Sequence, residues 1–224
     1  MKKIMAVLVI LTLLVTTVAF WAWSQKETFI LGKVKAGFSA LTGTEVVIKG
    51  VQVKKTEGLL FLVNISEIEV HNPAGFPVPQ MALLTDVEFI ISPWALLKGA
   101  WHADHAFAYL KKANVQYGRD GKFNLENIQA LHPREEKGVG KFHIKRLELK
   151  MGQIDYLDFR VQPPLEEPYA FDGKIEVYDH IASPEVLIQA PALKFIEKAN
   201  KGSLGLARGK IQESITKNTG NQAE

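Results

Sequence analysis

The chain has 224 residues, which is enough for one ordinary domain and an appendage, since globular domains most often run to roughly 100–150 residues. Its 27 basic and 24 acidic residues are scattered along the sequence and give a net charge of +3. This distribution argues against nucleic-acid binding, which needs a concentrated basic face. The sequence contains no cysteine, which excludes disulfides, thiolate nucleophiles and thiolate metal sites.

A long apolar segment occupies the N-terminus. From Ile4 to Trp23 there is no charged side chain, and as a helix this segment would span about 30 Å, the thickness of the bilayer hydrocarbon. Trp21 and Trp23 stand where an interfacial aromatic belt would lie. We predict that residues 1–24 are a single-pass transmembrane anchor. The alternative is a cleaved signal peptide, but the apolar run exceeds the usual core of such a peptide, about 7–15 residues.

The orientation of this anchor depends on the lysines that flank it. Lys26, Lys33 and Lys35 on the far side compete with Lys2 and Lys3 in the positive-inside count. The simplest arrangement keeps the short N-terminal tail inside and exports everything after residue 24.

After the anchor, the sequence predicts a helix over residues 25–43. Apolar residues recur there at helical intervals, and Gly43 stands where a helix would end. From residue 44 the apolar period changes to two, which is typical of strands. Residues 44–200 are predicted to form one β-rich domain with a loop at 132–141, and residues 201–224 are predicted to be a disordered tail.

The expected fold class is mainly β with short helices. A curved, antiparallel, meandering sheet would follow the transmembrane helix and form a groove that is open or partly closed by helices. One pair of strands is expected to pivot near Gly152. Residues 184–200 either cover the groove or extend the sheet. Ser183-Pro184-Glu185 is a good helix start, but Pro191 should break a long helix at a cost of about 3 kcal/mol, so that a second helix would run from Pro191 to Asn200.

Several short motifs follow one another along the chain. They are Thr-Gly-Thr at 42–44, an Asn-Pro-x-Gly-Phe corner at 72–76, "SPWALLKG" at 92–99 and "RDGKFNLENI" at 119–128. Their order and spacing resemble the N-terminal module of the AsmA-like proteins over residues 1–131 and, more loosely, over 142–160. The residues that carry the resemblance are Asn72, Pro73, Gly75, Phe76, Leu96, Leu97, Gly99, Gly121 and Asn124. Family members known for bridging membranes are several times longer, so the chain resembles the anchoring end without the bridge.

This resemblance implies a single-pass protein of the bacterial inner membrane, with its C-terminal domain in the periplasm and a non-catalytic role in envelope lipid handling, lipid transport or outer-membrane assembly. The alternating apolar face of the sheet would form a groove for phospholipid acyl chains. The candidate groove residues are Val47, Leu59, Phe61, Val63, Val87, Phe89, Ile91, Phe107, Leu147, Leu149 and Ile154. The alternative function is an anchored scaffold with a closed core, which would recruit an envelope protein or a second copy of the chain through exposed strand edges.

No arrangement in the sequence favours an enzyme, a cofactor or a metal site. His102 and His105 should point to opposite faces of a strand and so could not share an ion. Asp155 and Asp158 flank Tyr156 without a partner base, a glycine-rich phosphate loop or a nucleophile elbow nearby. We therefore predict no catalytic residue, no metal ligand and no cofactor.

Overall fold

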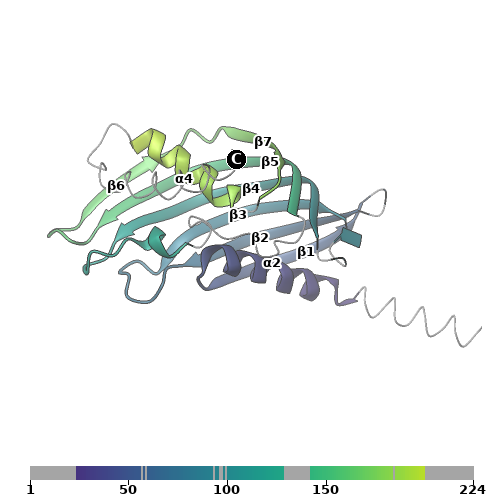
Figure 1. Ribbon diagram of the computed structural model, residues 1–224, viewed down its shortest axis with the longest axis horizontal. Helices are drawn as coiled ribbons and strands as arrows, with labels where there is room; N and C mark the ends of the chain where they lie inside the picture. Colours follow the sequence, from purple (N-terminus) through teal and green to yellow (C-terminus); the bar gives the residue numbers. More distant parts are fainter. Residues whose placement is uncertain are drawn as a thin grey trace, which may run out of the picture.

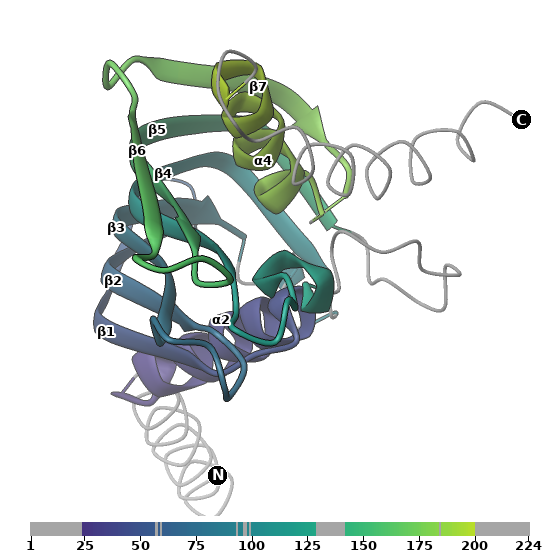
Figure 2. The same cartoon turned by 90° about the vertical axis from the view of Figure 1, so that its left-hand side faces the viewer.

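The protein is described by a computed structural model over residues 24–128 and 142–199, apart from residues 57, 59, 93, 96, 97, 99 and 184. Within these ranges the chain forms one curved sheet with two α-helices on its concave side (Figures 1 and 2). The elements in chain order are α2 (Lys26–Thr42), β1 (Val46–Lys55), β2 (Phe61–His71), β3 (Gln80–Ile91), β4 (Trp101–Tyr117), the 3₁₀ helix η2 (Asn124–Asn127), β5 (Phe142–Asp158), β6 (Leu165–Ala170), β7 (Ile175–Ile181) and α4 (Val186–Ala199).

Three predicted segments fall outside this description. They are residues 1–23 of the predicted anchor, the loop at 132–141 and the tail at 201–224. None of the helices that are described is both long and apolar enough to cross a bilayer.

The first four strands form an antiparallel meander, as the sequence predicts, but β4 and β5 are parallel. Between Tyr117 and Phe142 the chain returns to the end of the sheet at which β4 began, so β5 runs in the same direction as β4. A parallel pair requires a crossover of a dozen or more residues, and the sequence between these strands provides it. The expectation of a wholly antiparallel sheet is therefore wrong at this one pair.

The predicted pivot near Gly152 is also corrected, because β5 is one continuous strand through that residue. Gly152 marks instead the point at which the partner of β5 changes. β7 pairs with residues 144–150 of β5 and β6 pairs with residues 153–158. The N–H of Phe171, between these two edge strands, donates to the carbonyl oxygen of Gly152 at 2.7 Å.

Gly152 also lies against the neighbouring strand, where a side chain has no room. A Cβ at this position would come 2.5 Å from the carbonyl oxygen of Lys111. We expect Gly152→Ala to lower the free energy of unfolding by about 1–3 kcal/mol, because the backbone must shift to make space. Gly37→Ala, in α2 with nothing within 4 Å of the added atom, is the control and should be neutral or stabilising. Equal unfolding midpoints in urea for the two variants would contradict this account.

The inward-facing side of the sheet does not follow a single alternation. In β1, Val46 and Val53 are both buried although they are seven residues apart. In a regular strand they would point to opposite faces, so the alternation of inward and outward side chains shifts by one residue between them. Gly50, which lies in that interval, has φ +63°, and Asp86 in β3 has φ +52° where the register with β4 shifts. Such irregularities bend strands and increase the curvature of a sheet. Because of the shift in β1, Val47 points away from the core, contrary to its prediction as a groove residue.

The two helices occupy the concave side. α2 lies within the predicted range and ends where Gly43 adopts φ +72° and donates its N–H to the carbonyl oxygen of Ser39 at 2.8 Å. α4 covers the groove and does not extend the sheet, and it begins five residues before Pro191. Proline removes one helical hydrogen bond, but the apolar face of α4, with Leu187 and Phe195, packs on the core and offsets that cost. The expected break at Pro191 is therefore wrong, whereas the helix begins next to the start that the sequence indicates at residues 183–185.

Candidate functional site: an apolar cavity beneath the helices

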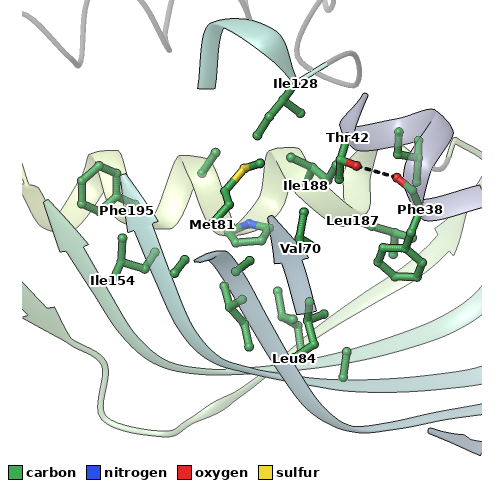
Figure 3. Close-up of a pocket in the computed structure, with 18 of the residues that line it drawn as sticks. Phe38, Thr42, Val70, Met81, Leu84, Ile128, Ile154, Leu187, Ile188 and Phe195 are labelled. Carbon is green, nitrogen blue, oxygen red and sulfur yellow. Dashed lines mark hydrogen bonds between the residues drawn. The ribbon is translucent and has the colours of Figure 1, made fainter. Parts of the chain in front are cut away.

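A cavity of about 150 Å³ lies between the concave face of the sheet and the two helices (Figure 3). Since one water occupies about 10–15 Å³ by this measure of volume, the cavity has room for roughly ten water molecules, or about 300 Å³ of liquid. This volume stands at the lower end of small-molecule sites, which start at about 300 Å³. The space is therefore suited to one slender ligand.

Four parts of the fold form the walls of the cavity. Figure 3 shows Phe38 and Thr42 of α2 on one side and Leu187, Ile188 and Phe195 of α4 on another. The sheet provides the floor, and η2 with the residue after it contributes Leu125 and Ile128. The floor residues are Val70, Met81, Ala82, Leu84, Val87, Phe89, Phe107, Ala108, Leu110, Ala113, Asn114, Val115, Leu147, Leu149 and Ile154.

The lining is apolar almost throughout. Among the described residues that border the cavity, only Thr42 and Asn114 have polar side chains, and none is ionisable. The Thr42 hydroxyl donates to the carbonyl oxygen of Phe38 at 2.9 Å, and Asn114 Nδ2 donates to the carbonyl oxygen of Gln80 at 2.8 Å. These bonds serve the protein's own backbone, so the cavity attracts a ligand by its apolar surface and not by charge.

Many of the lining side chains are only half-buried. Phe38, Leu84, Phe89, Leu187 and Ile188 all border the cavity without being fully removed from solvent. In a closed core such side chains would pack against each other at high density. An apolar ligand in this space would remove part of their surface from water, which contributes about 25 cal/mol per Å².

The predicted groove residues divide into two groups. Six of them border the cavity, namely Val87, Phe89, Phe107, Leu147, Leu149 and Ile154. Phe107 borders the cavity but does not pack with the hydrophobic core, whereas its neighbours Ala106 and Ala108 do. The others do not line it: Val63 and Ile91 are buried in the core, Phe61 packs half-buried against that core, Val47 faces away and Leu59 lies outside the described residues.

A groove partly closed by helices was expected, but none of the predicted groove residues lies on a helix. α2 supplies Phe38 and Leu41, and α4 supplies five residues including Pro191 and Ala192. The apolar period of residues 186–195 is that of a helix and could have placed α4 over the groove, but Pro191 obscured this pattern. The part of β3 around Met81 was missed because its alternation is interrupted by a register shift beside Val70.

The corner at 72–79, which the sequence marks as a turn, is held by buried amides near the far end of the cavity. Asn124 is fully buried, and its Oδ1 accepts the N–H of Gln116 at 2.9 Å. Its Nδ2 donates to the carbonyl oxygen of Asn114 at 2.7 Å and to Oδ1 of Asn72 at 2.9 Å. Asn72 Nδ2 in turn donates to the carbonyl oxygen of Val78 at 2.8 Å. Two of the residues that carry the resemblance, 52 positions apart, are thus in direct contact.

The other residues of the resemblance are structural where they are described. Gly75 and Gly121 adopt φ +100° and +79°, values that favour glycine in tight turns. Phe76, which follows Pro73 in the corner, packs beside Gly118. Leu96, Leu97 and Gly99 lie outside the described residues, as do the anchor residues Ile4, Trp21 and Trp23.

Aromatic side chains pack together near the ends of β4 and β5. The ring of Tyr117 lies 4.8 Å from that of Phe123 and 6.4 Å from that of Tyr156, and the Arg160 guanidinium lies 3.8 Å over Tyr117. Burial raises the pKa of Tyr156 to about 12, so this phenol is neutral at physiological pH. These rings belong to the hydrophobic core and do not border the cavity.

Asp158, at the end of β5, is paired with Arg160. Hydrogen bonds from Arg160, the nearest 2.6 Å, lower the pKa of the Asp158 carboxyl below its ordinary value. A lowered carboxyl pKa stabilises the fold above the unfolded-state pKa, and the gain is lost as the pH falls through the folded-state pKa. We expect Arg160→Leu to cost about 1–3 kcal/mol at pH 7, and the difference from the wild type to close below about pH 4.

The measurement for this prediction is urea unfolding from pH 7 to pH 3. Arg119→Leu, which removes an exposed arginine from a nearby turn, is the control and should leave stability unchanged at every pH. A constant difference between Arg160→Leu and the wild type across this range would contradict the role given to Asp158.

The residues considered for catalysis or metal binding form no such site in the part of the chain described. Ala103 and Ala106 are both in the core, so the register shift beside them places His102 and His105 on the same face, contrary to prediction. No group of three metal-ligating side chains is found among the described residues. Asp155 pairs with Lys112 at 2.8 Å, and Asp158 pairs with Arg160.

The architecture is thus an open sheet with helices over an apolar cavity. Comparison of the chain with protein-family models, with curated proteins and with solved structures finds no match in any of the three. The resemblance to AsmA-like proteins stays a prediction, carried by the motif residues named above.

Proposed function

We propose that the protein is a membrane-anchored, AsmA-like lipid-handling protein that holds an acyl chain in the cavity beneath α2 and α4, without catalysis. The observation that carries this proposal is a space lined by apolar, half-buried side chains and free of ionisable groups. Its site is the bacterial inner membrane, where residues 1–24 act as the anchor and the described domain faces the periplasm. Its role is in envelope lipid handling or outer-membrane assembly.

The mechanism is sequestration from water. A chain that buries about 200 Å² of apolar surface would gain about 5 kcal/mol before the costs of binding are subtracted. The charged headgroup would stay outside, since the described lining offers no ionic partner. The anchor would keep the cavity near the bilayer from which lipids are drawn.

Photo-crosslinking tests this proposal. The full chain is reconstituted with a phospholipid that carries a diazirine on its acyl chain, irradiated and digested, and the modified peptides are identified by mass spectrometry. We expect adducts on α4 and on the lining strands β3 to β5. The same lipid with the diazirine on its headgroup is the control and should not label those peptides. Adducts confined to residues 1–23 would contradict a lipid-holding cavity.

A scaffold role is the second candidate, and one observation favours it. β7 pairs only with β5 among the described strands, and its Ile175 and Val177 are 51% and 45% exposed. An edge strand with exposed apolar side chains can bind an extended segment of a partner protein. The double substitution Ile175→Lys, Val177→Lys tests this role. If it abolishes the protein's role in the envelope while acyl-chain crosslinking persists, the scaffold role is favoured.

A further inference from the structure

One end of the sheet brings together the start of α2 and two connections between strands. The Glu27 carboxylate in the first turn of α2 accepts the N–H of Val53, near the end of β1, at 3.4 Å. The pairing of Phe61 with Ile91 places the β1–β2 turn and the β3–β4 connection at that same end. We call this part of the molecule, made of the described residues 24–29, 54–56, 58, 60, 92, 94, 95, 98 and 100, the proximal end. Figure 1 shows the start of α2 beside the end of β1.

The proximal end exposes two large aromatic side chains. Trp94 is 63% exposed, the largest fraction among the large apolar side chains described, and Phe29 is 45% exposed. Trp94 stands on a helical turn, closed by the N–H of Lys98 to its carbonyl oxygen at 3.3 Å. The turn is capped by Ser92 Oγ, which accepts the N–H of Ala95 at 3.4 Å. A tryptophan held outward in this way has the chemistry of a membrane-interface residue, with an apolar ring and a polar N–H.

Basic side chains lie at the same end of the sheet as these aromatics. Lys54, Lys55 and Lys98 are exposed at the proximal end, and Lys26 is half-buried there. Glu27 is the one acidic residue among the described residues of the proximal end, and it accepts the N–H of Val53. Glu57, in the same turn as Lys54 and Lys55 by sequence, lies outside the described residues. A lysine near an anionic bilayer surface contributes about 1 kcal/mol to binding. Exposed aromatics together with lysines are complementary to a surface of anionic phospholipid.

The position of the chain before α2 points to the same partner. This step depends on the membrane anchor of the proposed function. Only Ser24 and Gln25 separate Trp23 from Lys26, and three residue steps span at most about 11 Å. If residues 1–24 cross the bilayer, the proximal end must lie close to its surface.

We propose that the proximal end docks on the bilayer surface, with Trp94 at headgroup depth and Lys54, Lys55 and Lys98 against anionic headgroups. The strands then stand away from the membrane. Phe89 and Met81 line the cavity two and ten residues along β3 from Ile91, which is about 7 Å and 33 Å at 3.3 Å per residue. The acyl chain in the cavity has therefore left the leaflet entirely, and the protein holds an extracted lipid.

Site-directed spin labelling tests the docking, and the absence of native cysteine allows single labels. Nitroxides are attached to Trp94→Cys and, as the matched control at the opposite end of the sheet, to Asp120→Cys in the full chain. Both proteins are reconstituted in vesicles of phosphatidylethanolamine and phosphatidylglycerol. Relaxation by oxygen, which partitions into the bilayer, is compared with relaxation by a water-soluble nickel chelate.

Docking predicts that the label at position 94 prefers oxygen and that the label at 120 prefers nickel. A label at 94 as accessible to nickel as the label at 120 would overturn the proposal, as would a label shielded from both reagents, which would indicate a protein partner or a second copy. Alkaline carbonate extraction tests the anchor separately. If the chain is released, docking is measured by flotation of the released chain with the same vesicles, and Lys55→Glu should weaken it about fivefold or more.

Discussion

Ala192→Trp is expected to abolish acyl-chain capture while the protein remains folded. Ala192 lies on the face of α4 that borders the cavity and is half-buried there. A tryptophan side chain buries about 150–250 Å², as much surface as the proposed ligand offers, and it would fill the space that the chain needs. We expect crosslinking of the acyl-chain probe to α4 and β3 to fall about tenfold or more, which corresponds to at least about 1.4 kcal/mol.

The neighbouring residue provides the matched control. Leu193 is 37% exposed and does not border the cavity, so Leu193→Trp adds a large ring to the same helix without occupying the site. Its crosslinking should equal that of the wild type. Both variants should unfold at a similar urea concentration, because the cavity accepts the added ring. Undiminished crosslinking in Ala192→Trp would show that the lipid binds elsewhere.

Asn124→Ala is expected to have the largest effect on stability, about 3–5 kcal/mol. The substitution leaves the N–H of Gln116 and the carbonyl oxygen of Asn114 without the amide that now bonds them. Each buried polar group left unsatisfied costs about 1–3 kcal/mol, and Asn72 also loses a donor. Since these bonds tie the 72–79 corner to the end of β4, the far end of the cavity should loosen as well.

Urea unfolding measures this cost, and hydrogen exchange of the corner locates it. Lys122→Ala, an exposed change in the adjacent turn, is the control and should stay within about 0.5 kcal/mol of the wild type. Asn72→Ala should share part of the penalty and should not add to Asn124→Ala in the double variant, because the two side chains form one network. Full additivity would contradict the network.

The fold could be predicted where local chemistry decides it. The period of two in β1 to β3 and the glycine that ends α2 are local signals, and the meander follows from short turns. The parallel pairing of β4 and β5 could not be predicted in this way, because it depends on the path of the chain between Tyr117 and Phe142. The orientation of Val47 could not be predicted for a related reason. The shift at Gly50 reverses which residues of β1 face the core, and the composition of the strand does not reveal this.

The candidate site was predictable on the sheet and not on the helices. Val87, Phe89, Leu147, Leu149 and Ile154 border the cavity because strand alternation holds locally around them. The opposite wall depends on α4, whose continuity through Pro191 is a tertiary effect: packing of its apolar face outweighs the lost hydrogen bond. The buried contact between Asn72 and Asn124 joins two turns that are distant in sequence, and no local sequence pattern predicts it.

The most direct test of the account is the lipid content of the full chain purified from its own membrane. Native mass spectrometry, followed by organic extraction of the same sample, would compare the wild type with Ala192→Trp. Lipid bound around a membrane anchor is the same in both proteins, so the difference in lipid content reports on the cavity. The account predicts one additional phospholipid per chain in the wild type, absent from Ala192→Trp and retained in Leu193→Trp. Identical lipid content in all three proteins, each well folded, would contradict the claim that the cavity holds a lipid.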